Sequence, residues 1–219
     1  KGYQKSFGFK FAKKHLIEHD LMNKKKIPIK KNSLKAIYIS HTIEHLNADS
    51  NQFLFNEVYR MLKPGGFFRI VSPDLKFYLR MYNRNYRKWM QKTVSIYSEE
   101  FTNEQLFLKM FATSLSKTFP SNDLKKISKK KFKSMFLKYG PERTLDKLYT
   151  YIPDKVVSKY PRNHDSWHTE ESLIKKLKKV GFSDVFVSRY LQSQCLEMQD
   201  KEYFDKTHPE FSLYVEGIK

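Results

Sequence analysis

Residues 36–72 read AIYISHTIEHLNADSNQFLFNEVYRMLKPGGFFRIVS, and this stretch decides the fold. It begins with a short apolar run at 36–40 and ends with another at 67–72, and both are typical of buried strands. Between them, Asp49 or Ser50 can cap a helix whose apolar residues recur at helical spacing: Leu54, Val58, Met61 and Leu62. Strands joined by a helical crossover of this length are normally parallel, so the stretch predicts two neighbouring parallel strands.

The segments that follow predict a helical insertion and then a return to strands. Apolar residues spaced by three and four predict one long helix, and they are Leu75, Leu79, Tyr82, Tyr86 and Trp89. Two more helices are expected at 105–115 and 124–139. Because this stretch is long for a crossover, we interpret 74–163 as an inserted helical lid over a substrate site. A helix between Thr169 and Gly181 follows, and then strands at 184–190 and 211–216.

The length of 219 residues fits one domain, which we place at 1–219. We predict an α/β fold with a Rossmann-like, mostly parallel sheet that is incomplete at its amino-terminal side and carries the helical insertion. The single cysteine, Cys195, excludes an internal disulfide framework and favours a reducing, cytoplasmic location. No apolar run approaches the ~20 residues that span a bilayer.

The formal net charge of +19 favours anionic partners, such as nucleic acid or an acidic polymer. Lysine runs at 125–126 and 129–131 offer one surface for such a partner, although runs of this kind usually mark a solvated face. Charge alone does not choose among these partners, and the sequence does not reveal the oligomeric state.

Five segments resemble class I S-adenosylmethionine-dependent methyltransferases, in the order in which that family has them. They are the strand and turn at 33–46, the helix end and LKPGG turn at 57–66, the SPDL strand exit at 72–75, the GFSDV turn at 181–185 and the SLYVE strand at 212–216. The last is common in a branch associated with surface-polysaccharide or small-metabolite methylation. The resemblance covers about 18–75 and 164–219, and it implies a Rossmann-like fold with S-adenosylmethionine as cofactor.

One part of the family pattern is absent from this sequence. Such enzymes begin with a strand and a GxGxG-type loop that approaches the cofactor closely. Before Asp20 the chain has only the isolated Gly2 and Gly8. Either an amino-terminal portion of the natural protein is missing here, or the cofactor half has been lost and the domain serves as a binding module. The first explanation, or a replacement strand from another chain, is favoured because loss of a central strand would expose sheet edges.

The resemblance also implies a set of site residues. Asp20 and Leu21 match the position near the adenine, while Ser40, His41 and His45 lie at or after the end of the fourth strand. We therefore expect these five residues to contact the cofactor. A loop or helix-cap aspartate is an equally good interpretation of Asp20, and His45 with Glu44 can instead hold the turn together.

Catalytic roles are expected for three residues. His164 and Asp165 precede the late helix, where the branch often carries a histidine facing the acceptor, and we expect them to act with His41. A structural hydrogen-bonded pair is an equally good interpretation of His164 and Asp165, and a loop histidine is the alternative for His41. His164 and His168 have helical ligand spacing but precede the helix and have no cysteine nearby, so we expect no metal.

The expected function is methyl transfer from S-adenosylmethionine to an oxygen or nitrogen of a small-molecule or glycan-like acceptor. The alternative is a non-catalytic methyltransferase-like domain that binds an anionic partner or serves as a scaffold. An RNA methyltransferase is a third hypothesis, and it predicts both cofactor binding and a steep salt dependence of RNA binding.

Overall fold

The computed structural model describes residues 16–219, so Gly2 and Gly8 lie outside the described part. The strands are β1 (Leu34–Ser40), β2 (Leu62–Pro73), β3 (Asp184–Val187) and β4 (Ser212–Ile218). The α-helices are α1 (Ala48–Met61), α2 (Leu75–Asn83), α3 (Arg87–Val94), α4 (Asn103–Phe111), α5 (Lys129–Tyr139), α6 (Pro141–Tyr149), α7 (Asp154–Lys159) and α8 (Glu170–Val180). Short 3-10 helices form at Leu21–Asn23, Ile43–His45, Thr113–Leu115, Leu196–Gln199 and Pro209–Phe211.

The four described strands form one sheet in the order β1-β2-β4-β3. β1 and β2 are parallel, with Ala36 opposite Phe67 and Ser40 opposite Val71, so the predicted strand–helix–strand unit is confirmed. The α/β class is also confirmed. The expectation of mostly parallel pairing is wrong for these strands, because β4 is antiparallel to both β2 and β3. β1, β2 and β3 nevertheless run in the same direction, since β4 alone is reversed between two of them.

The junction between α1 and β2 differs from the prediction. The helix begins at the cap Asn47, whose side chain accepts from Ser50 N, and it ends at Met61, before the glycines. Residues 63–66 belong to β2, and the register shifts there between Leu34 and Ala36 of β1. Gly65 has φ +74°, a conformation that L side chains rarely adopt. The glycines therefore shape an irregularity at the start of the strand and do not end the helix.

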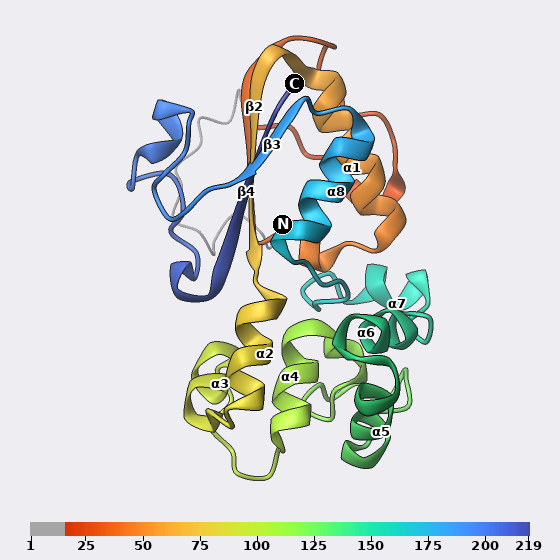
Figure 1. The fold of residues 1–219 in the computed structure, drawn as a ribbon. Coiled ribbons are helices and arrows are strands. Elements are labelled where there is room, and N and C mark those ends of the chain that lie inside the picture. Colours follow the sequence, from red (N-terminus) through yellow and green to blue (C-terminus); the bar gives the residue numbers. More distant parts are fainter. Residues whose placement is uncertain (1–15) are drawn as a thin grey trace.

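Two hydrophobic cores stabilise the chain. One lies between the sheet and the helices α1 and α8, which cover the same face in Figure 1. α8 is capped at its start by Thr169, which forms a capping box with Ser172, and at its end by Gly181, as the sequence predicts. The other core belongs to the helical part, α2 to α7, which lies beyond the carboxyl end of β2.

The helical part contains more breaks than the sequence pattern predicts. The expected long helix over 75–89 is divided into α2 and α3, because Asn85 has φ 57° and cannot continue a right-handed helix. The helix expected at 124–139 begins only after the cap Ser128. No helix formed by residues 16–219 is long and apolar enough to cross a membrane.

The second face of the sheet carries a buried ionic network and is covered by residues 188–211 (Figure 1). Arg69 of β2 has no exposed surface, and it forms ion pairs with Asp205 and with Glu216 of β4. The guanidinium also donates to Ser188 Oγ at 2.6 Å and to the carbonyl of Arg189 at 2.9 Å. The network therefore joins the covering segment to the middle of the sheet.

Candidate functional site

The candidate site lies beyond the carboxyl end of β1, where the turn containing His41, Glu44 and His45 meets the loop before α8. The backbone N–H groups of Asp165 and Ser166 donate to the Glu44 carbonyl at 2.9 and 3.1 Å. These bonds bring together residues that are more than a hundred positions apart in the sequence. Ligands of open α/β sheets bind beyond the carboxyl ends of the strands, so the position suits a ligand site.

His41 occupies a strained position at the start of this turn. Its φ of 46° lies in the left-handed region, which is uncommon for a residue other than glycine and is often found at functional sites. The ring Nδ1 lies 3.2 Å from Glu44 Oε1, and Nε2 lies 2.9 Å from Ser212 Oγ of β4. His41 therefore links the turn to the last strand of the sheet.

Glu44 is a buried carboxylate, with 2% of its surface exposed. Neither of its side-chain oxygens has a hydrogen-bond partner among the described residues. Burial acts to raise the pKa of this group, but the neighbouring His41, His164 and His45 outweigh it and hold the pKa at about 2. Glu44 is thus ionised at neutral pH, and the His41 contact is an ion pair whenever that ring is protonated.

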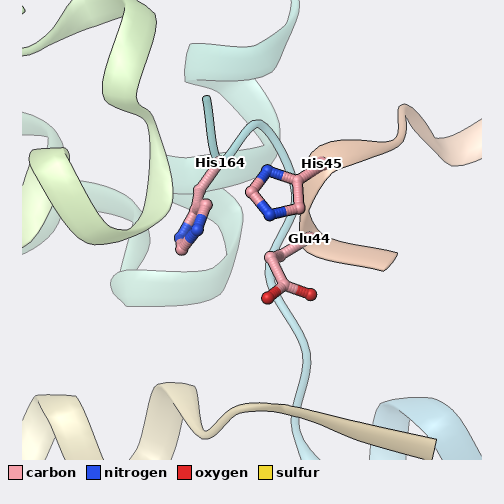
Figure 2. A group of neighbouring side chains, drawn as sticks. All are labelled: Glu44, His45 and His164. Carbon is pink, nitrogen blue, oxygen red and sulfur yellow. The ribbon is translucent and has the colours of Figure 1, made fainter. Parts of the chain in front are cut away.

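His45 and His164 face each other beside Glu44 (Figure 2). Their ring centroids are 4.6 Å apart. His45 Nδ1 lies 3.0 Å from the carbonyl oxygen of Asn163, and His164 Nδ1 lies 2.7 Å from that of Met110. Because a carbonyl oxygen only accepts, each Nδ1 must carry the proton, which leaves Nε2 of each neutral ring as a free acceptor.

His164 and Asp165, expected to act together, have separate side-chain partners. Burial lowers the pKa of His164 to about 4 and raises that of Asp165 to about 6. Asp165 Oδ2 lies 3.4 Å from Ser114 Oγ, and its Oδ1 has no partner among the described residues. His168, the other member of the predicted helical spacing, is buried with Nε2 at 3.2 Å from Ser166 Oγ, and burial lowers its pKa to about 3.

The residues expected to contact the cofactor differ in their exposure and in whether their polar atoms already have hydrogen-bond partners. Asp20 is exposed, and its Oδ1 accepts from Met22 N at 2.9 Å, capping the 3-10 helix Leu21–Asn23. Leu21 packs against the core of the sheet. Ser40 Oγ is buried at the end of β1; it lies near enough to the Tyr38 hydroxyl to act on its pKa, but it has no well-formed hydrogen bond within the described chain. A buried hydroxyl of this kind fits a nucleoside hydroxyl, because buried polar groups are otherwise almost always hydrogen-bonded.

Several contacts of the site were not predicted from the sequence. Ser212 and His208 approach His41 from the last strand and the turn before it, with the two histidine ring centroids 5.5 Å apart. The carbonyls of Met110 and Asn163, which orient two histidines, belong to backbone and leave no signal in the sequence. A hollow of about 500 Å³ lies elsewhere, in the helical part, and none of the predicted site residues lines it; its residues are Leu115, Leu124, Lys125, Lys126, Ile127, Ser128, Lys131 and Tyr151.

Comparison with known proteins gives one family match, in which residues 6–70 fit the methyltransferase domain family. This segment includes β1, α1 and most of β2, so the match supports the resemblance to methyltransferases in the parallel unit. It does not distinguish the polysaccharide branch or the acceptor. No curated protein matches the chain.

Solved structures similar to this chain include two SAM-dependent methyltransferases and a third protein, from three organisms. A SAM-dependent methyltransferase from Archaeoglobus fulgidus is 13% identical, with 93% of this chain and 66% of that chain covered and a TM-score of 0.40. A SAM-dependent methyltransferase from Thermotoga maritima, titled a possible histamine N-methyltransferase, is 13% identical, with 93% and 63% covered and a TM-score of 0.41. PKMT2 from Rickettsia typhi is 13% identical, with 91% and 37% covered and a TM-score of 0.37. The chain thus spans less than two thirds of the first two structures.

Proposed function

We propose that this chain is part of a class I methyltransferase that transfers a methyl group from S-adenosylmethionine to an oxygen or nitrogen of a small-molecule or glycan-like acceptor. The observation that carries the proposal is the coincidence of the methyltransferase family match, at 6–70, with the parallel β1–α1–β2 unit. The alternative of a non-catalytic domain that binds an anionic partner has less support, because the family match points to methyl transfer and charge alone identifies no partner.

The residues at the carboxyl end of β1 would hold the cofactor, which supplies the activated methyl group. The Asp20 carboxylate would accept from the adenine amino group, with Leu21 beside the ring. Ser40 Oγ would bond a nucleoside hydroxyl. His41 and His45, from the same turn, would border the cofactor on the side of the acceptor.

The acceptor would lie between this turn and the helical part, with residues 74–163 closing over it as a lid. An O–H or N–H acceptor must lose its proton, and a base works best when its pKa lies near the working pH. Asp165, with a pKa of about 6, meets this requirement better than His164, with a pKa of about 4. We therefore assign proton removal to Asp165 and orientation of the acceptor to His164 and His41.

Isothermal titration of the full-length natural protein with S-adenosylmethionine tests the proposal. Asp20→Ala removes a charged hydrogen-bond acceptor and should weaken binding roughly tenfold to a hundredfold. Asp184→Ala, which alters an exposed aspartate on β3, is the matched control and should bind as the wild type does. The absence of any binding heat at high protein concentration would overturn the assignment.

A further inference from the structure

Glu44, His45 and His164 form a group of metal-ligating side chains, of which Glu44 has no part in the methyl-transfer proposal, while His45 and His164 border the proposed cofactor and acceptor. Within residues 16–219 their ligand atoms all lie within 4.8 Å of one another. Glu44 and His45 come from the turn after β1, and His164 comes from the loop before α8 (Figure 2).

The two histidines are already in the tautomer that a metal needs. Their Nδ1 atoms donate to the carbonyls of Asn163 and Met110, which leaves both Nε2 lone pairs free. Histidines that bind metals almost always donate their other ring N–H to a carbonyl or carboxylate in this way, because the bond fixes the ring orientation.

Glu44 supplies the negative charge that a cation would neutralise. Its carboxylate is buried, and both oxygens lack a hydrogen bond among the described residues. A buried carboxylate without partners costs free energy, and an unsatisfied group of this kind in a native protein calls for an ion or water beside it. The nearby His41 ring, with Nδ1 at 3.2 Å, offers a competing explanation as a simple ion pair.

The backbone around the group is held from several directions. Asn51 Nδ2 donates to the carbonyls of Ile43 and Leu46 at 2.9 and 3.2 Å, and Ser166 Oγ donates to that of Ile43 at 2.8 Å. With the bonds from Asp165 and Ser166 to the Glu44 carbonyl, they fix the turn and the loop against each other. A site held in this way is preorganised for a ligand.

We propose that Glu44, His45 and His164 bind a divalent first-row transition-metal ion. Two imidazoles and one carboxylate are the donor set of catalytic zinc sites, which keep an open position for another ligand. With metal–ligand bonds of about 2.0–2.1 Å in a tetrahedral site, donor atoms lie roughly 3.3 Å apart, so the three side chains must close from separations of up to 4.8 Å when they bind the ion.

Titration of the chelator-treated full-length protein with ZnCl₂, followed by calorimetry, tests this site directly. We expect one equivalent of Zn²⁺ per chain. Glu44→Gln, His45→Ala and His164→Ala should each weaken binding by at least about a hundredfold, more than the loss of an outer-shell partner does. His19→Ala is the matched control: within the described residues its Nε2 hydrogen-bonds to the carbonyl of Lys25, far from the three ligands in the sequence, and its removal should leave the affinity unchanged.

Circular dichroism identifies any variant that does not fold, and X-ray absorption of the Zn²⁺-loaded wild-type protein then decides the question without variants. Two imidazole ligands in the first coordination shell support the site, whereas fewer than two overturn it. The proposal also fails if the wild type binds no stoichiometric Zn²⁺, or if Glu44→Gln, His45→Ala and His164→Ala, all folded, bind as tightly as the wild type. Absence of Zn²⁺ binding by the wild type would leave the neighbouring histidines, with His41 at 3.2 Å, as the compensation for the buried charge.

Discussion

Replacing Arg69 by alanine should lower the stability of this protein more than almost any substitution on its surface. The guanidinium lies between Asp205 and Glu216, and all three side chains are fully or almost fully buried. Its removal leaves two buried carboxylates without their counter-ion and also removes the hydrogen bonds to Ser188 Oγ and to the carbonyl of Arg189. Breaking a buried pair by removing one partner costs about 3–5 kcal/mol, because the remaining charge is uncompensated.

The expected loss is large enough to measure without ambiguity. For a chain of this size, 1 kcal/mol lowers Tm by about 2–4 °C, so Arg69→Ala should lower it by roughly 6–20 °C. Far-UV circular dichroism follows the whole chain. Tryptophan fluorescence follows the helical core, because Trp89 and Trp167 both pack against it. Coincidence of the two transitions would establish that unfolding is two-state.

Lys35→Ala provides the control, because Lys35 forms an ion pair with Glu197 in which both side chains are mostly exposed. Exposed pairs contribute little to stability, so this variant should unfold with the wild type. An Arg69→Ala protein that unfolds together with Lys35→Ala would refute the assignment of the network as a stabilising link between β2, β4 and residues 188–211.

Three further changes test other parts of the structure. A Cβ at Gly217 would stand 2.9 Å from Phe182 Cδ1, so Gly217→Ala should lower the free energy of unfolding in urea by about 1–3 kcal/mol. Adding Phe182→Leu to the same chain should restore part of the lost stability. A Gly217→Ala protein as stable as the wild type would contradict the close packing of Phe182 on Gly217. Thr169→Ala removes the cap that pairs with Ser172 and should cost about 0.5–2 kcal/mol, whereas Thr169→Ser should cost little; equal losses would exclude the cap as the cause. Burial raises the pKa of the Asp74 carboxyl above its ordinary 3.8, so the folded state binds this proton more tightly than the unfolded state, and the protein loses stability as the pH rises from the unfolded pKa through the folded one. Asp74→Asn keeps the cap on Lys76 N and should therefore be at least as stable as the wild type at pH 7. A difference in stability between the two proteins that does not close toward pH 4 would contradict this.

Local sequence patterns predicted the elements of the sheet better than their arrangement. The run at 36–40, the spacing of Leu54 and Val58, and the run at 67–72 each report a local period, and the parallel unit follows from them. The insertion of β4 between β2 and β3 leaves no such signal, since the strand's alternation is the same in either direction. Asn85 did carry a signal, because asparagine tolerates the left-handed conformation that divides the predicted helix.

The candidate site was predicted in part for the same reason. His41 and His45 follow a predicted strand directly, so their place at its carboxyl end is a local inference. The approach of His164 to Glu44 depends on the path of the whole helical part between them. The sequence pairs His164 with His168 by their spacing, and this local pairing missed Glu44 and His45, which the fold brings beside His164.

The position of β4 also bears on how the chain is made. The ribosome completes β2 long before β4 emerges, and at ordinary rates of synthesis the delay amounts to roughly 7–30 s. During that interval the β2 edge that β4 will occupy has no partner, and an unpaired apolar edge invites association between nascent chains. A chaperone that shields this edge during translation would thus raise the yield of folded protein more than one added after release.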